Sequence, residues 1–320
     1  MNKSIFTALL VVIVSVAQAQ TNTVSLNQTG IGNQVVTTQK GIGNTNTISL
    51  SGTDNNASAN QTGSTLRGTI WVSGNRNTAT IQADHYLNEA TVQQVGDDNT
   101  GFAFTTLRSD HNQVALRQNG NSNRGNAYAT DHSDDNQVGI WQLGNGNTGE
   151  AFTAYRSAHN RINLFQNGDG NTASVNAYGS DRNQVGLTQA GDGNTGSAAA
   201  LSTDRSTVSL YQAGDGNRGA ISANDGSDNR GNLTQTGARN SAVFSQAGIG
   251  NEATIQQTGN SNTLTNLTVD PDVRVRIRYL GAVQQGIGNT FTLSQQGDGN
   301  TLRFGQNGSH NTATVTQTAY

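Results

Sequence analysis

The chain has 320 residues, of which 32% are hydrophobic and 5% aromatic, with 39 glycines, one proline and no cysteine. So few large apolar side chains could hardly fill two ordinary globular cores, which leaves disorder or a thin, repetitive structure. The formal net charge is -3, and no basic stripe or acidic tail interrupts the sequence. We therefore expect no specific nucleic-acid partner.

The first residues have the pattern of a secretory signal peptide. Lys3 precedes an apolar run from Ile5 to Val16, and Ala17-Gln18-Ala19 fits an A-x-A cleavage site. We expect residues 1–19 to be a signal peptide and residues 20–320 to be one repeat domain. Because the apolar run is shorter than the ~20 residues that cross a bilayer, we expect no membrane insertion. An exported chain without cysteine has no disulfides, so its order has to come from its own repeated contacts.

A motif of the form Q-x-G-x-x-N occurs fourteen times, at intervals of 11 residues or about twice that. Each Asn begins a segment of alternating apolar and polar residues that ends at a Gln six positions later. Val114, Leu116 and Gln118, for example, share one face with Asn112. This period of two is typical of a strand with one buried face and one solvated face.

Bulky and small interiors alternate along the central segments. Val114 and Leu116 are followed by Gly125 and Ala127, so bulky strands are expected to face small ones and to close at native packing density. Short turns rich in Gly, Asp, Asn and Ser connect the strands. With Arg278 counted as a degenerate start there are 26 segments, or about 13 coils. The predicted fold is an all-β, amyloid-like cross-β solenoid with two strands per coil.

In such a stack each Gln lies above a Gln and each Asn above an Asn, so their amides can form hydrogen-bonded ladders. The first and last segments are full copies of the motif without a polar cap, and bare strand edges template further pairing. We expect ladder and assembly contacts at Asn22, Gln28, Asn33, Gln39, Asn112, Gln118, Asn136, Gln142, Asn160, Gln166, Asn183, Gln189, Asn300, Gln306, Asn311 and Gln317.

The run Gln-x-Gly-x-Gly-Asn, with alternating strands and a second Gln six residues on, resembles the curlin repeat of curli fibre subunits. The resemblance extends from Asn22 to Gln317, although the chain has many more coils than is usual. It implies a structural subunit of a secreted, extracellular curli-like amyloid fibre (a fimbrium). Such a subunit self-assembles end to end and contributes to biofilm matrix and surface adhesion. It also implies three partners: other copies of the chain, a curli-type nucleator or major subunit, and an outer-membrane curli export pore.

Several Gln positions of the small-interior segments carry other residues, namely Thr105, Ala129, Thr153, Ala177, Ala200 and Ala223. One stretch near 267–279 breaks the register and contains Pro271 followed by Val-Arg-Val-Arg-Ile-Arg. We expect a solvated insertion there, and binding of an anionic matrix polymer is the alternative.

No residues converge on catalysis. Lys40 is the single lysine after the signal peptide, and no Ser, His and acid share a position in the register, so we expect no enzyme, cofactor or metal site. Asp169, Asp192, Asp215 and Asp298 occur in G-D-G-N turns, where they are interpreted as turn formers, with weak divalent-ion binding as the alternative. The five histidines are interpreted as solvated loop residues.

Outward aromatic residues precede the Gln of some bulky strands. Trp141, Phe165 and Tyr211 are candidate surface contacts, and ordinary cross-strand packing is the alternative. Outward T-x-T pairs such as Thr290 and Thr292 keep a second function open, that of an ice-binding or adhesive monomeric β-solenoid.

Overall fold

The computed structural model describes residues 11–12, 21–266 and 282–319, and all 27 of the elements found there are strands. The predicted signal peptide, apart from Val11–Val12, and the predicted insertion at 267–279 lie outside the described residues. The chain divides into unit 1 (Met1–Arg156) and unit 2 (Ser157–Tyr320). Over the described ranges, no helix is long and apolar enough to cross a bilayer.

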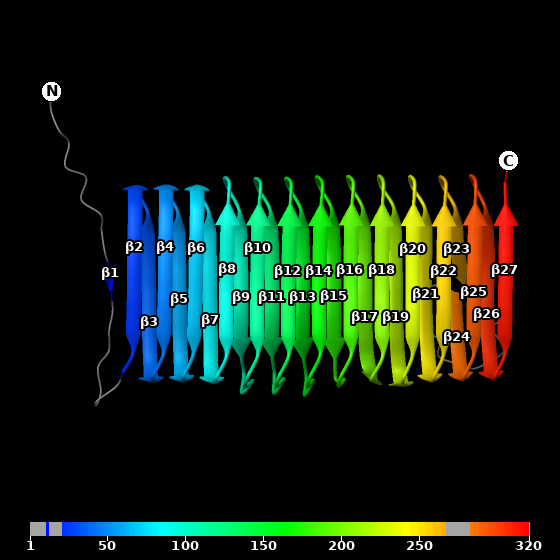
Figure 1. The fold of residues 1–320 in the computed structure, drawn as a ribbon, viewed down its shortest axis with the longest axis horizontal. Coiled ribbons are helices and arrows are strands. Elements are labelled where there is room, and N and C mark those ends of the chain that lie inside the picture. Colours follow the sequence, from blue (N-terminus) through cyan, green and yellow to red (C-terminus); the bar gives the residue numbers. More distant parts are fainter. Residues whose placement is uncertain (1–10, 13–20, 267–281, 320) are drawn as a thin grey trace, which may run out of the picture. The chain divides into compact units, whose positions relative to one another are not determined.

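Unit 1 contains two parallel sheets, whose strands run from blue to green in Figure 1. Sheet 1A is formed, in spatial order, by β1 (Val11–Val12), β3 (Gln34–Ile42), β5 (Asn56–Ser64), β7 (Thr78–Tyr86), β9 (Thr100–Thr106), β11 (Arg124–Thr130) and β13 (Thr148–Ala154). Sheet 1B is formed by β2 (Thr23–Ile31), β4 (Thr45–Thr53), β6 (Arg67–Asn75), β8 (Glu89–Val95), β10 (Gln113–Asn119) and β12 (Gln137–Leu143). Successive strands therefore alternate between the sheets, and two strands complete one coil.

Unit 2 repeats this arrangement. Sheet 2A contains β15 (Thr172–Tyr178), β17 (Thr195–Asp204), β19 (Arg218–Ser227), β21 (Ser241–Ile249), β23 (Thr263–Asn266), β24 (Ala282–Ile287) and β26 (Thr301–Ser309). Sheet 2B contains β14 (Arg161–Asn167), β16 (Gln184–Ala190), β18 (Thr207–Ala213), β20 (Arg230–Thr236), β22 (Glu252–Thr258), β25 (Thr290–Gln296) and β27 (Thr312–Thr318). The predicted β-solenoid with two strands per coil is confirmed.

The structure has about 12 coils, whereas the sequence predicts about 13. One feature of unit 2 accounts for the difference. Both β23 and β24 pair with β21 on one side and with β26 on the other, so they share one layer. Asn262 and Leu264 begin that layer, and Ala282 and Gln284 complete it. The predicted segment start at Arg278 lies outside the described residues, and β24 does not form a layer separate from β23.

Alternation decides which face of each strand is buried. In β10, Val114, Leu116 and Gln118 are at most 1% exposed, whereas Gln113 and Arg117 on the other face are exposed. Neighbouring strands pair without a shift, so Gln118 lies level with Gln94 in β8 and with Gln142 in β12. Because a slip of one residue would turn the buried face outward, the pattern itself fixes this register.

Glycine is required where the two sheets of a coil meet. An added Cβ at Gly125 in sheet 1A would lie 2.4 Å from Cδ1 of Leu116 in sheet 1B, closer than any ordinary contact. A Cβ at Gly219 would similarly lie 2.8 Å from Cδ1 of Leu210 in unit 2. The predicted pairing of bulky with small interiors is therefore present in the packing of both units.

The turns need glycine for a different reason. Gly168, the first glycine of its turn, has a φ of +117°, and a Cβ there would lie 2.3 Å from the carbonyl oxygen of Gly191 in the next coil. Only glycine combines this left-handed backbone with so close an approach. Glycine at this position therefore allows the turns of successive coils to stack as closely as the strands do.

Replacement of Gly125 by Ala is expected to lower the free energy of unfolding by about 1–3 kcal/mol, because the methyl group overpacks the interior against Leu116. Gly186 is the matched control, since it lies on the outward face of β16 with no atom within 4 Å of an added Cβ. Guanidinium denaturation of Gly125→Ala and Gly186→Ala measures both changes. Equal stability of the two variants would contradict this packing.

Candidate assembly site

The side-chain amide of a Gln in the middle of a ladder makes two kinds of hydrogen bond. Gln118 Nε2 donates to Gln142 Oε1 in the next strand of sheet 1B at 2.8 Å, and to the backbone oxygen of Thr100 in sheet 1A at 3.1 Å. One bond runs along the stack and the other crosses the interior. The Gln therefore ties successive coils together and also ties the two sheets to each other.

The same geometry continues through both units. In unit 1, Gln94 donates to Gln118 at 2.8 Å and Gln39 donates to Gln61 at 2.9 Å. In unit 2 the bonds are 2.7–3.0 Å long and join Gln166 to Gln189, Gln189 to Gln212, Gln212 to Gln235, Gln235 to Gln257, Gln257 to Gln295, Gln295 to Gln317, Gln246 to Gln284 and Gln284 to Gln306. Every donor precedes its acceptor in sequence, so the ladders have one direction.

Where a ladder is interrupted, a buried polar atom loses its partner. Gln94 Oε1 has none among the described residues, because Val72 occupies the preceding position in β6. Gln246 Oε1 lacks a partner because the preceding strand carries Ala223 at that level. Such buried unsatisfied atoms are uncommon in proteins, and here each marks the first Gln of a ladder.

The Asn ladders run in the opposite direction. Asn123 donates from its backbone N–H at 3.0 Å and from Nδ2 at 3.1 Å, in both cases to Asn99 Oδ1 in the preceding coil. Asn99 Nδ2 in turn donates to the backbone oxygen of Gly120 at 2.7 Å. Each Asn therefore closes a turn as well as joining two coils. Ser206 takes the Asn place once, and its Oγ accepts the N–H of Asn229 at 3.1 Å.

The structure divides the predicted site residues into an interior group and an edge group. The interior group is at most 8% exposed and contains Asn33, Gln39, Asn112, Gln118, Asn136, Gln142, Asn160, Gln166, Asn183 and Gln189. The edge group is half-buried or exposed and contains Asn22, Gln28, Asn300, Gln306, Asn311 and Gln317. Members of each ladder within a unit come together, with the exception of Gln28. Gln28 lies level with Leu50 of β4, and its Nε2 has no hydrogen-bond partner among the described residues. The edge residues have a neighbouring strand on one side.

The inward faces of the two edge strands are partly open. Val24 and Leu26 in β2 are half-buried, and so are Ala313 and Val315 in β27. In sheet 2A, Phe304 of β26 is 8% exposed. In sheet 1A, β1 pairs along the edge of β3. Apolar and amide groups that are buried in every interior strand are therefore accessible at β2 and β27.

One set of stacking residues was missed by the sequence reasoning. Ser109 and Ser133 lie in the long turns and are fully buried, and Ser133 N–H donates to Ser109 Oγ at 3.1 Å. In unit 2, Ser180 N–H donates to Ser157 Oγ at 3.2 Å. A Ser three residues before the segment-starting Asn is the available signal, but Ser is so common in turns that the sequence alone indicates only a turn former.

The Asp residues of the G-D-G-N turns form a backbone-capping column. Asp192 Oδ1 accepts the N–H of Asp169 at 2.8 Å, and Asp215 Oδ1 accepts the N–H of Asp192 at 3.0 Å. Across the described ranges, no group of three or more His, Asp or Glu side chains is placed to hold a metal ion. These carboxylates therefore act as turn-stabilising acceptors in this structure.

The three candidate surface aromatics lie on outward faces. Trp141, in unit 1, is 48% exposed, and the guanidinium carbon of Arg117 lies 5.0 Å from the centre of its ring. Phe165 and Tyr211 are in unit 2, where Phe165 is half-buried and Tyr211 is 42% exposed.

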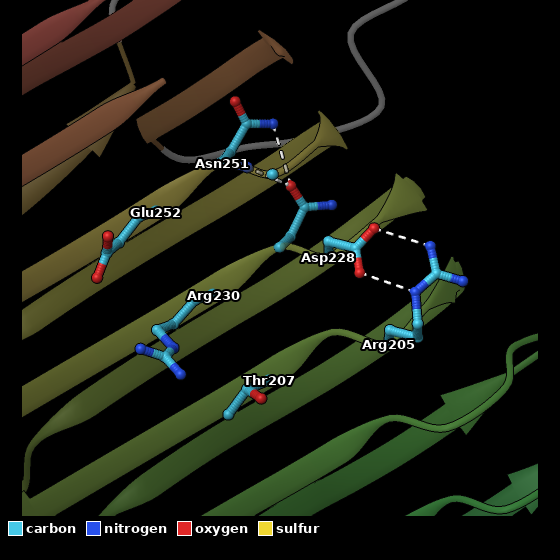
Figure 2. A pocket seen from close by; sticks show the side chains of 8 residues that line it. Arg205, Thr207, Asp228, Arg230, Asn251 and Glu252 are labelled. Carbon is cyan, nitrogen blue, oxygen red and sulfur yellow. Dashed lines mark hydrogen bonds and ion pairs between the residues drawn. The ribbon is translucent and has the colours of Figure 1, made fainter. Parts of the chain in front are cut away.

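A polar hollow of about 340 Å³ opens beside the turns of unit 2 (Figure 2). Arg205 and Asp228 form a two-bond ion pair at its rim, with both N–O distances at 2.8 Å, and Thr207, Arg230 and Glu252 lie level with one another on successive strands. The hydrogen bond from Arg205, followed by one from Ser227, lowers the pKa of Asp228 to about 2. Two basic and two acidic groups balance each other here, so the hollow favours no charged ligand.

Breaking a ladder in its middle is expected to cost more than breaking it at its first member. Gln118→Leu leaves two ladder groups without their partners, an amide hydrogen of Gln94 and the side-chain oxygen of Gln142. Gln94→Leu leaves one ladder group without its partner, the side-chain oxygen of Gln118. At about 1–3 kcal/mol per buried unsatisfied group, Gln118→Leu should be the less stable variant by that amount. Denaturant unfolding of both variants checks the order, and the reverse order would refute the ladder energetics.

The Arg205–Asp228 pair predicts a pH dependence. Because the folded pKa of Asp228, about 2, lies below the ~3.9 of an unfolded Asp, the pair stabilises the fold above about pH 4 and loses this effect as the pH falls toward 2. In an NMR titration, Arg205→Gln should raise the pKa of Asp228 toward its ordinary value. Arg239→Gln, in an opposite turn, is the control, and an unchanged pKa in Arg205→Gln would disprove the pairing.

Three segments of the chain match the family described as "Curlin associated repeat", at residues 203–237, 226–259 and 283–318. No curated protein sequence matches the chain. The matched segments carry part of the Gln and Asn ladders of unit 2, including Gln212, Gln235, Gln295 and Gln317. Over these segments the chain is similar to curlin-associated repeats.

Proposed function

We propose that this chain is a structural subunit of an extracellular curli-like amyloid fibre, and that copies join head to tail in a single direction. The observation that carries the proposal is the one-way direction of the Gln ladders. A Gln in the middle of a ladder, such as Gln118, receives a hydrogen bond from the preceding coil and gives one to the following coil. A ladder of this kind ends in a donor on one edge and an acceptor on the other, so unlike edges are complementary.

The two edges match each other in register as well as in direction. If β27 of one copy pairs with β2 of the next, Val315 meets Leu26 and Gln317 Nε2 meets Gln28 Oε1. In the second sheet, Phe304 meets Thr37 and Gln306 meets Gln39. Val315 and Leu26 then cover each other, and Gln amides meet across the junction in both sheets. In the first sheet the contact ends at Gln28, because Leu50 is the next residue at that level, whereas in the second sheet the ladder continues from Gln39 to Gln61.

The Asn ladders strengthen the same choice of partner edge. They donate toward the preceding coil, as Asn311 does to Asn289 at 3.0 Å, so Asn311 Oδ1 remains the acceptor at the β27 edge. Pairing like edges would set Gln donors against Gln donors and Asn acceptors against Asn acceptors. Head-to-tail growth avoids both conflicts.

Cleavage at Ala19 also belongs to the proposal. β1 (Val11–Val12) pairs with the edge of β3, next to Val36 and Thr37. Removal of residues 1–19 would free the edge of β3 once the chain has left the cell. Exposure of β3, which docks beside β2 in the proposed junction, would then be coupled to export.

The cellular setting rests on the curlin family rather than on geometry. We infer export through an outer-membrane curli pore, growth on a curli-type nucleator or major subunit, and a place in biofilm matrix and surface adhesion. Ice binding is less well supported, because the outward Thr pairs that lie in register are confined to β25 and β27 among the described strands, while β22 carries Glu252 at that level.

A charge on the inward face of the last strand should block elongation. Val315→Lys places an ammonium group where Leu26 of the next copy would pack, and inward-pointing charges are an effective block to edge pairing. Thr316→Lys is the matched control, because Thr316 is the next residue of β27 but points outward. Seeded growth followed by thioflavin-T fluorescence should be strongly slowed for Val315→Lys and nearly unchanged for Thr316→Lys; equal growth rates would rule out docking through β27.

A further inference from the structure

The outward face of sheet 1B contains a small hollow that the fibre does not use. Its volume is about 170 Å³, and it lies between Arg117 and Asn119 of β10 and the flanking strands β8 and β12. Trp141 and Leu143 form one wall, and Gln93 lies on the other side. Ordinary small-molecule pockets exceed roughly 300 Å³, so this hollow fits one ring of an extended chain rather than a whole ligand.

Arg117 is a cation without an acidic neighbour on this face. It lies level with Gln93 in β8 and with Trp141 in β12, and its own strand places Ala115 and Asn119 beside it. The next residues on the two flanking strands are Thr91, Val95, Gly139 and Leu143. Its charge is therefore not neutralised by any adjacent outward residue, which favours an anionic ligand.

Trp141 offers a flat surface beside that charge. The indole is 48% exposed, and the outward position two residues earlier on β12 is Gly139. Arg117 lies over the ring at 5.0 Å, an arrangement that orders the guanidinium while its edge can still donate to a carboxylate.

The rim of the hollow supplies neutral hydrogen-bonding groups. The amides of Gln93 and Asn119 both donate and accept, which suits hydroxyl groups. A sugar ring with a carboxylate uses all three features, since its C–H face stacks on an indole, its carboxylate binds a guanidinium and its hydroxyls bind amides. A protein partner would need about 800 Å² of surface with an apolar centre, whereas the outward residues next to the hollow include Thr91, Gln113 and Gln137.

We propose that Arg117, Trp141, Gln93 and Asn119 form a binding site for an acidic polysaccharide, with one uronic acid residue seated in the hollow. The polymer continues past the site over the sheet face. The site is independent of the ladder edges, so the chain can hold polysaccharide without interrupting end-to-end growth.

The test measures binding of fluorescently labelled polygalacturonate to the full-length soluble chain by anisotropy, with labelled dextran as the neutral polymer. Trp141→Ala and Arg117→Gln should each weaken polygalacturonate binding by about tenfold or more, as loss of a central Trp or Arg contact does. Arg117→Lys should keep part of the affinity, and dextran should bind weakly. Tyr155→Ala, which removes an aromatic residue that is 51% exposed in a turn of unit 1, should bind like the wild type.

Circular dichroism and seeded growth of each variant separate a folding or assembly defect from a binding defect. If Trp141→Ala fails to fold, the comparison of Arg117→Gln with Arg117→Lys decides. The proposal is overturned if the two site variants bind polygalacturonate like the wild type, if Tyr155→Ala loses as much affinity, or if dextran binds equally well. It is also overturned if the site variants reduce lateral bundling of fibres without polymer and leave polymer binding intact, because the occupant would then be a second copy of the chain.

Discussion

A Gln side chain held in a dry interior needs partners for both amide hydrogens and for its oxygen, and repetition at a fixed spacing is what provides them here. Gln118 donates once along the stack and once across it, and it accepts from Gln94. The crossing bond requires the sheets to stay close, which in turn requires glycine at positions such as Gly125 opposite Leu116. The close packing of the two sheets is therefore tied to satisfying this amide.

The same bond links stability to function. Inside the chain a ladder Gln is satisfied by the coils on both sides, but at β27 Gln317 has a coil on one side and shares its edge with half-buried Ala313 and Val315. In the proposed fibre, another copy of the chain covers these groups. Because Gln donates forward and Asn donates backward, we propose that β2 of the next copy, rather than another β27, completes the β27 edge.

Alternation and repeat spacing were sufficient to predict the strands, the inward position of Asn112 and Gln118, and the pairing of bulky with small interiors. Contacts that depend on where one coil lies over the next were not predictable in this way. Arg278 resembles a segment start in the sequence, yet β23 and β24 pair with the same strand, β21, and share one layer. Buried Ser133 resembles an ordinary turn residue, and the bond from Gln118 to Thr100 depends on a distance between sheets that no sequence period encodes.

The central claim is that the ladders pass from one copy to the next through unlike edges. Solid-state NMR of fibres grown from an equal mixture of ¹⁵N-labelled and ¹³C-labelled chains detects side-chain contacts between molecules alone. The account predicts cross-peaks between the amide nitrogen of Gln317 and the side-chain carbonyl carbon of Gln28, and between Gln306 and Gln39. Cross-peaks between Gln317 of one copy and Gln317 of another, or fibres in which none of these Gln pairs is in contact, would contradict it.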